Sequence, residues 1–336
     1  MTDPICFLYP GQGAQHIGMG SDLIDAFAIA RRRFETAREV LGFPLADMCC
    51  HGPLHALNQD LNAQLAVYTV SCIVTDILKA EGIHPAAAAG YSSGFYAAAY
   101  AAGCFDFGTG LTIVRTAGEL LVNNRPCPDA AMGVVFGLSR ETVADLCRRV
   151  GDVDIAIINT PRQIIISGKR PSIDRVFHKA HAHGALDIYP LPAANAYHSR
   201  WMRTNSRRLH DSLPSFRIRA PRLPLYSYST LETVAGAPQL IRIMADQLHQ
   251  PVLWVDLIKK LRDNKYNAMV EVGPGTLISR SVRWVDRRIQ MLNTASMRQI
   301  KRVVQRLSTD GANRADRVLE CAALRWKPCD SIDNRG

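Results

Sequence analysis

The stretch Ala89-Gly90-Tyr91-Ser92-Ser93-Gly94-Phe95-Tyr96-Ala97-Ala98-Ala99 decides the fold that we expect for the whole chain. It contains Gly-x-Ser-x-Gly centred on Ser92, the pattern of a nucleophile elbow, a sharp turn between a strand and a helix. The apolar residues 84–89 predict the strand, and the alanine-rich residues 95–103 predict the helix. The Ser92 hydroxyl would then lie at a helix N-terminus, which favours negative charge. The motif alone also fits a tight turn with a solvated serine.

The composition is that of an ordinary globular protein, with 336 residues, 47% hydrophobic and 21% charged. This length fits one large α/β domain or two unequal ones, and we expect neither a membrane span nor a signal peptide. Nine cysteines without a Cys-x-x-Cys pair favour reduced thiols in the cytoplasm over disulfides or a zinc site. The net charge of +10 favours an acidic partner: nucleic acid, an anionic cofactor ester or an acidic carrier protein.

A glycine-rich loop, Pro10-Gly11-Gln12-Gly13-Ala14-Gln15, follows a short apolar strand expected at residues 5–9. The loop lacks the third glycine of a dinucleotide fingerprint and the Lys-Ser/Thr pair of a phosphate-binding loop. Two other interpretations stay open. The loop is either a structural turn or a source of backbone amide donors beside a nucleophile.

Arg115 and Glu119 are the charged residues of a mostly apolar helix expected at residues 107–122. An arginine side chain can extend along the edge of a core and keep its guanidinium in water. Alternatively, the guanidinium turns inward, where its planar fork can hold a carboxylate with two hydrogen bonds. The helix pattern leaves both interpretations open.

The order of predicted elements changes between residues 127 and 195. Strands are expected at 131–138, 153–159, 162–167 and 186–191, and helices at 140–150 and 172–184. This βαββαβ order is the ferredoxin-like arrangement. We therefore predict α/β architecture with a discontinuous core domain (1–126 and 196–310), an inserted small subdomain (127–195), and a C-terminal helix and tail (311–336). Within the core domain, helices are expected at 22–42 and 62–81, the second of them buried.

Eight motifs in order carry a resemblance to a known family. They are Pro10-Gly11-Gln12-Gly13, Gln64, Gly90-x-Ser92-x-Gly94, Arg115, Asn159-Thr160-Pro161, Ala196-Tyr197-His198-Ser199, Gln250-Pro251-Val252 and Glu271-Val272-Gly273-Pro274-Gly275. Over residues 5–300 the chain resembles the malonyl-CoA:acyl carrier protein transacylases, which include the acyltransferase domains of fatty acid and polyketide synthases. The resemblance implies an α/β-hydrolase-like core with a parallel sheet and a ferredoxin-like insert.

The resemblance also implies a mechanism and its residues. Ser92 would attack the thioester of malonyl-CoA, and His198 would take the serine proton and return it to the leaving thiol. The backbone amides of Gln12 and Ser93 would form the oxyanion hole. A backbone carbonyl, expected at Gln250, would orient His198. Further supporting residues are Gln64, Asn159 and Tyr197.

The substrate and partners follow from the same resemblance. Arg115 would pair with the malonyl carboxylate, and the Tyr197 ring would crowd a 2-methyl branch, so malonyl is favoured over acetyl and methylmalonyl. The acceptor would be the phosphopantetheine thiol of an acidic acyl carrier protein. We expect a cytoplasmic monomer without metal, cofactor, nucleic acid or membrane. Tyr91, Ser93 and Phe95 depart from the family pattern and bear on acyl selectivity.

The same residues fit three alternative functions. A related subunit of malonate decarboxylase loads malonyl onto its own carrier protein. A related hydrolase releases acyl groups from carrier proteins to water, and such enzymes need no carboxylate clamp. The third alternative is a basic docking module without enzymatic activity.

Overall fold

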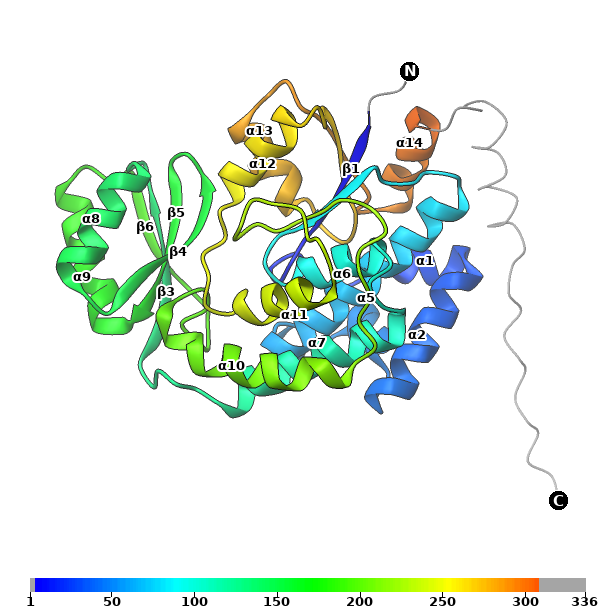
Figure 1. Cartoon of the computed structure of the whole chain (residues 1–336), viewed down its shortest axis with the longest axis horizontal. Helices are drawn as coiled ribbons and strands as arrows, with labels where there is room; N and C mark the ends of the chain where they lie inside the picture. Colours follow the sequence, from blue (N-terminus) through cyan, green and yellow to red (C-terminus); the bar gives the residue numbers. More distant parts are fainter. Residues whose placement is uncertain (1–3, 308–336) are drawn as a thin grey trace.

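Two β-sheets of different type organise the protein (Figure 1), whose computed structural model describes residues 4–307. The first sheet has five parallel strands in the order β7-β2-β1-β8-β9. Its strands are β1 (Ile5–Tyr9), β2 (Ala87–Gly90), β7 (Leu225–Tyr226), β8 (Ala268–Glu271) and β9 (Gln290–Asn293). The central strands β1 and β2 are short apolar runs because helices cover both faces of a parallel sheet.

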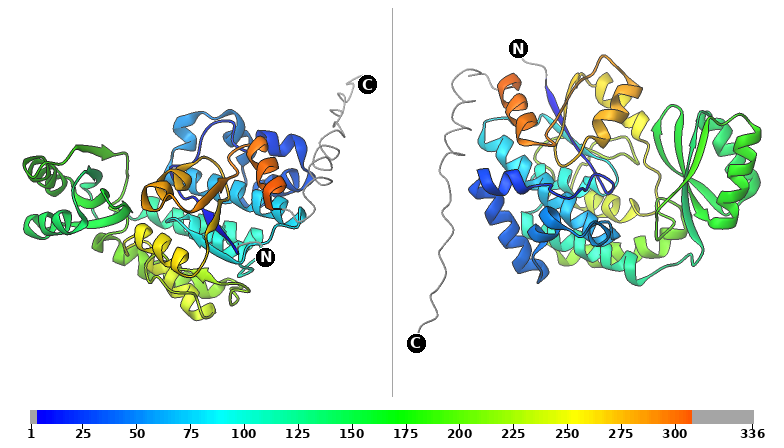
Figure 2. Two further views of the ribbon diagram at one scale, coloured as in Figure 1. Left: turned by 90° about the horizontal axis from the view of Figure 1, so that it is seen from above. Right: turned by 180° about the vertical axis from the view of Figure 1, so that it is seen from behind.

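Helices of the larger body surround the first sheet in Figures 1 and 2. They are α1 (Ser21–Ala26), α2 (Ala28–Leu41), α3 (Leu45–His51), α4 (Leu54–Leu57), α5 (Asp60–Ala80), α6 (Gly94–Ala101), α7 (Phe107–Asn123), α10 (Arg203–Ser212), α11 (Ala237–Asp246), α12 (Trp254–Asp263), α13 (Leu277–Val285) and α14 (Met297–Leu307), with short 3-10 turns at Arg200–Met202 and Leu213–Ser215. Among the described residues, only α5 is long and apolar enough to cross a membrane, and 83% of its most apolar window is buried inside the protein. It is therefore a core helix, as its pattern predicted.

The second sheet is antiparallel, with strand order β4-β5-β3-β6. Its elements follow one another as β3 (Ala130–Phe136), α8 (Arg140–Val150), β4 (Val153–Thr160), β5 (Gln163–Lys169), α9 (Arg170–Ala182) and β6 (Asp187–Leu191). This confirms the predicted ferredoxin-like order. The hydroxyl of Ser139 accepts a hydrogen bond from the Thr142 amide at 3.2 Å and so caps α8.

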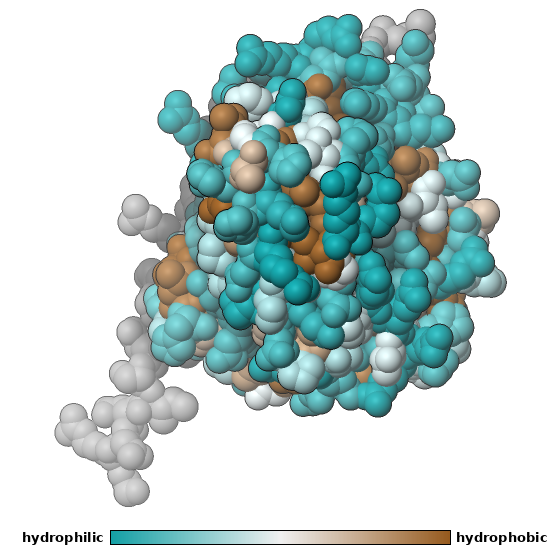
Figure 3. Space-filling model, turned by 90° about the vertical axis from the view of Figure 1, so that its left-hand side faces the viewer, coloured by the Kyte–Doolittle hydropathy of each residue, from teal (hydrophilic) through white to brown (hydrophobic). Residues whose placement is uncertain are grey.

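The two faces of the second sheet have different partners because side chains alternate along a strand. On β3, Ala131 and Val135 pack with α8 and α9, whereas Met132 and Val134 join the core of the larger body. The outer side of α8 and α9 is largely hydrophilic (Figure 3). The inner face of this sheet is therefore available to form one wall of a site between the two sheets.

Several predicted elements differ from the structure. The helix expected at 22–42 is interrupted at Phe27, whose backbone is extended at φ −127°. The edge strand β7 has only two residues, and no sequence pattern indicated α3, α4 or β9. The C-terminal helix and tail expected at 311–336 lie outside the described residues. The exact domain boundaries stay a prediction.

Candidate active site

Ser92 occupies the sharp turn that its glycine neighbours predicted, between β2 and α6. Its φ of 51° lies in the left-handed region, which a non-glycine residue adopts rarely and mostly where function requires it. Gly94 is needed for a close approach, since a Cβ there would lie 2.2 Å from the Tyr9 carbonyl oxygen. The unusual Tyr91 and Phe95 are buried and pack edge-on against Trp254 and Tyr228.

Both ring nitrogens of His198 have a hydrogen-bond partner. Its Nε2 lies 2.8 Å from the Ser92 Oγ, and its Nδ1 lies 3.0 Å from the Gln250 carbonyl oxygen. Because a carbonyl only accepts, Nδ1 carries the proton and Nε2 is free to accept from the serine hydroxyl. Burial lowers the pKa of His198 to about 4, so the imidazole is a neutral base at neutral pH.

The low pKa of His198 predicts an unusual pH profile for acylation of Ser92. The base works in its neutral form, so lowering its pKa extends activity toward acid. We expect a rate that is flat from about pH 8 down to about pH 5 and falls near pH 4. Single-turnover acylation measured across this range tests the expectation. A midpoint close to the ordinary value of 6.5 would contradict it.

The loop before α1 supplies the backbone amide expected in the oxyanion hole. Gly11 permits the approach of this loop, since a Cβ there would lie 2.4 Å from the Tyr91 carbonyl oxygen. The Gln12 amide does not stand free, because it donates a hydrogen bond to the Ser93 hydroxyl at 3.1 Å. In the resting site, the Ser93 side chain therefore occupies one of the two donors that an oxyanion would need.

Replacing Ser93 with alanine should raise the rate of Ser92 acylation about fivefold, since one hydrogen bond contributes about 1 kcal/mol. The change frees the Gln12 amide before the substrate arrives. Rapid-quench measurement of the acyl-enzyme tests this, with Ser93→Thr as the control that keeps a hydroxyl. A slower Ser93→Ala enzyme would show that the hydroxyl assists the reaction instead.

A polar network behind the pocket joins the loop to the base. The Gln12 side-chain amide donates to Asp60 Oδ1 at 2.6 Å, and the Tyr197 hydroxyl donates to Asp60 Oδ2. Gln64 donates to the Gln12 side-chain carbonyl at 3.3 Å. Asp60, at the start of α5, thus connects the oxyanion loop with the residue next to His198. No sequence motif points to Asp60, because 137 positions separate it from Tyr197.

A cavity of about 570 Å³ opens onto Ser92. It is lined by most of the predicted site residues, namely Gln12, Gln64, Ser92, Ser93, Asn159, Tyr197 and His198. Gln250 instead lines a separate hollow of about 410 Å³, which also reaches His198. Asn159 comes from β4 of the second sheet, where its side-chain amide donates to Gln163 at 2.6 Å. The cavity therefore lies between the two sheets.

The prediction that Arg115 faces the substrate is wrong. The guanidinium donates to the Val40 carbonyl oxygen at 2.7 Å and lies 3.8 Å from the Glu119 carboxylate. Its side chain is 35% exposed and is not part of the cavity lining. The physical reason is helical phase: Leu121 is the α7 residue that reaches the cavity, and Arg115 lies on a different face of the same helix. The alternative interpretation, an arginine at the edge of the core, is the one observed.

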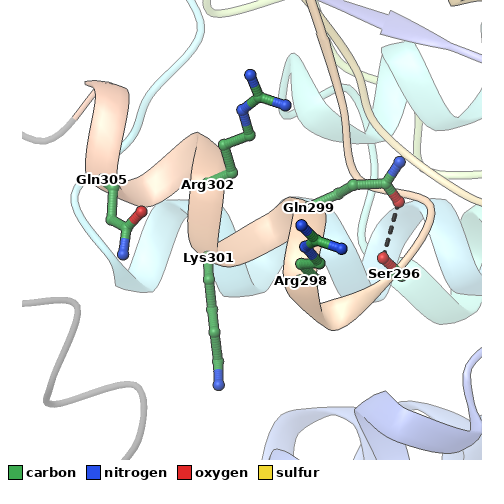
Figure 4. Close-up of a pocket in the computed structure, with 6 residues that line it drawn as sticks. All are labelled: Ser296, Arg298, Gln299, Lys301, Arg302 and Gln305. Carbon is green, nitrogen blue, oxygen red and sulfur yellow. Dashed lines mark hydrogen bonds between the residues drawn. The ribbon is translucent and has the colours of Figure 1, made fainter.

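The basic C-terminal helix is also separate from the Ser92 cavity. Figure 4 shows Arg298, Lys301 and Arg302 spread along α14, with the Ser296 hydroxyl bonded to Gln299 at 2.8 Å. These residues line a different hollow. Within residues 4–307, no group of three His, Cys, Asp or Glu side chains is arranged to hold a metal ion.

The elbow serine beside a buried histidine, at the end of a parallel strand, is an arrangement suited to acyl chemistry, and comparisons with known proteins identify the class as acyltransferase. Residues 6–322 match the family described as acyl transferase domain. The malonyl CoA-acyl carrier protein transacylase of Bacillus subtilis is 30% identical over 92% of this chain and 99% of its own length. The polyketide biosynthesis malonyl CoA-acyl carrier protein transacylase of Bacillus velezensis is 35% identical over 82% and 94%.

A solved structure is similar over the same extent. The malonyl CoA-acyl carrier protein transacylase of Coxiella burnetii superposes with a TM-score of 0.88 at 27% identity, covering 92% of this chain and 99% of that one. The chain belongs to the malonyl-CoA:acyl carrier protein transacylase family. This confirms the predicted family and fold, and it removes the alternative of a docking module without enzymatic activity.

Proposed function

We propose that the protein transfers a malonyl group from malonyl-CoA to the phosphopantetheine thiol of an acyl carrier protein, through an ester on Ser92. The observation that carries the proposal is the chain of contacts from Ser92 through His198 to the Gln250 carbonyl, at 2.8 and 3.0 Å. The donor and acceptor come from the names of the similar proteins in fatty acid and polyketide synthesis. An acidic carrier would complement the net charge of +10.

The proposed reaction has two matching halves. The Ser92 Oγ attacks the thioester carbonyl while its proton passes to His198 Nε2. The carbon–sulfur bond then breaks, and the departing thiolate takes the proton from His198. In the second half, the carrier thiol gives its proton to His198 and attacks the ester, which restores the serine hydroxyl. The amides of Gln12 and Ser93 would stabilise the oxyanion once the Ser93 hydroxyl releases the first of them.

Intact-protein mass after mixing with malonyl-CoA tests the proposal. The native protein should gain one malonyl group, and the Ser92→Ala variant should gain none. Adding a carrier protein that bears phosphopantetheine should discharge the adduct and transfer its mass to the carrier. An adduct that persists in the Ser92→Ala variant would refute the seryl ester, and discharge to free acid alone would refute transfer.

One observation favours a second candidate function, the hydrolysis of acyl groups from carrier proteins. The cavity lining includes no arginine or lysine among the described residues, as expected for an enzyme that needs no carboxylate clamp. The same mass experiment separates the two functions. A hydrolase would release the free acid from an acylated carrier protein, whereas a transferase would leave the acyl group on one of two thiols.

A further inference from the structure

We propose that the Ser92 site also accepts uncharged acyl groups, including chains longer than malonyl that carry a keto or hydroxy oxygen. The chemistry is that of the proposed function, on which the inference rests. The acyl carbon leaves the thioester sulfur for the Ser92 Oγ, and the serine proton passes through His198 to the departing thiolate. What differs is the part of the acyl group that lies beyond the reacting carbonyl.

The first argument is the charge of the cavity. No Asp, Glu, Lys or Arg side chain is found among the described residues that line it. His198 is the ring closest to the reaction, and burial keeps it neutral at neutral pH by lowering its pKa. A carboxylate that enters this space loses water and meets no opposite charge, which is unfavourable. An uncharged acyl chain has no such cost.

The second argument is the face that α7 turns toward the cavity. Leu121 lines the cavity, and Ala117, one helical turn earlier on the same face, is buried. An arginine that reached the cavity from α7 would have to lie on this face of the helix. Both residues on the face are uncharged. The Arg115 side chain points away from the cavity, and its guanidinium donates a hydrogen bond to the Val40 carbonyl oxygen.

The third argument is the shape and lining of the cavity. Apolar side chains from the second sheet, from α7 and from the loop after α11 form much of its wall: Leu121, Met132, Val134, Ile157, Ile165, Leu191 and Leu248. Its volume of about 570 Å³ is within the range of small-molecule sites. Three lining residues have a buried polar atom with no close hydrogen-bond partner: the Tyr96 hydroxyl oxygen, the Asn159 side-chain oxygen and the Gln247 side-chain nitrogen. The Tyr96 hydroxyl and the Gln247 amide lie near each other, and both are neutral groups that can donate to a carbonyl or hydroxyl oxygen on an acyl chain.

Malonyl-CoA and acetoacetyl-CoA form a matched pair of probes, because their acyl groups are similar in shape and differ in charge at the far end. The measurement is the initial rate of mass gain on Ser92 with each donor. A carboxylate clamp would favour malonyl on the order of 10⁴-fold, whereas a cavity without one should keep the two rates within about 100-fold. Butyryl-CoA extends the test to a chain without the second oxygen and should also label the protein.

Two variants test whether an arginine outside the cavity lining binds a carboxylate. Arg115→Ala should leave the malonyl-to-acetoacetyl ratio unchanged. The same holds for Arg280→Ala, which removes an exposed cation from an adjoining hollow that shares Gly13 and Leu277 with the cavity. A ratio that collapses in either variant would overturn the inference and identify the clamp.

The outcomes also separate this inference from the proposed function. Labelling by malonyl-CoA alone would overturn the inference and leave the malonyl transferase standing. Labelling by acetoacetyl-CoA and butyryl-CoA that is absent in Ser92→Ala would support the inference. No Ser92 adduct with any of the three donors would overturn both, because the inference requires the acyl-enzyme.

Discussion

Replacing His198 with alanine is expected to slow acylation of Ser92 on the order of 10⁴-fold, as loss of the base does in other serine enzymes. The hydroxyl proton would have no acceptor, because His198 Nε2 is the group 2.8 Å from the Ser92 Oγ. Rapid-quench mass measurement of the malonyl ester gives the rate. Thermal unfolding of the variant should remain cooperative, which shows that the loss is chemical.

His249 provides the matched control for this experiment. It lines the outer hollow next to Gln250 and contacts the Gln250 side chain at 3.2 Å, without reaching Ser92. His249→Ala should keep a rate close to that of the native protein. A His198→Ala enzyme that retains more than about a tenth of the native rate would contradict the assignment of the base, since general base catalysis contributes at least 100-fold.

Replacing Gly94 with alanine should lower the free energy of unfolding by about 3 kcal/mol or more and remove the acyl-enzyme. The added Cβ would lie 2.2 Å from the Tyr9 carbonyl oxygen and 2.7 Å from that of Pro10. Both atoms belong to the backbone that ends the central strand β1, so they cannot move aside as a flexible side chain could. Relief of the clash would push α6 away from the sheet and displace Ser92.

Gly108→Ala is the control for the Gly94 experiment. This glycine lies in α7, and a Cβ there would come no closer than 3.8 Å to another atom. Alanine is favoured over glycine inside a helix by about 1 kcal/mol, so the control should be stabilised or unchanged. Urea unfolding followed by circular dichroism compares the two. Equal stability of the two variants would show that β1 and α6 adjust freely.

Residues whose position depends on a short local motif could be predicted from the sequence. Ser92 was predicted because glycines on both sides mark a sharp turn, and the alternation of strands and helices at 130–191 predicted the second sheet. The edge strand β9 was missed because it is short and only Leu292 of its four residues is buried, so its hydrophobic pattern is weak. The break at Phe27 was missed because an apolar residue in the middle of a helical pattern gives no signal for an extended backbone.

Residues that depend on distant parts of the chain could not be placed in the same way. The phase of α7 decides whether Arg115 or Leu121 faces the substrate, and phase is set by packing against α2 and α5. Asp60 becomes part of the site only because α5 brings its first turn to Gln12 and Tyr197. The contact between the Gln12 amide and Ser93 likewise depends on two loops that are 81 positions apart.

The reacting residues and many of the residues that line the acyl cavity come from different parts of the protein, so chimeric enzymes can be designed. Ser92 and His198 belong to the larger body, whereas Met132, Ile157 and Ile165 belong to the second sheet. Grafting residues 130–191 from a relative should therefore transfer the part of the acyl preference that depends on the second sheet and keep the reactivity of Ser92. Val252 joins the larger body to the second sheet, because its backbone exchanges hydrogen bonds of 2.8 and 2.9 Å with strand β4. A graft that keeps this pairing also keeps the nearby carbonyl that orients the base.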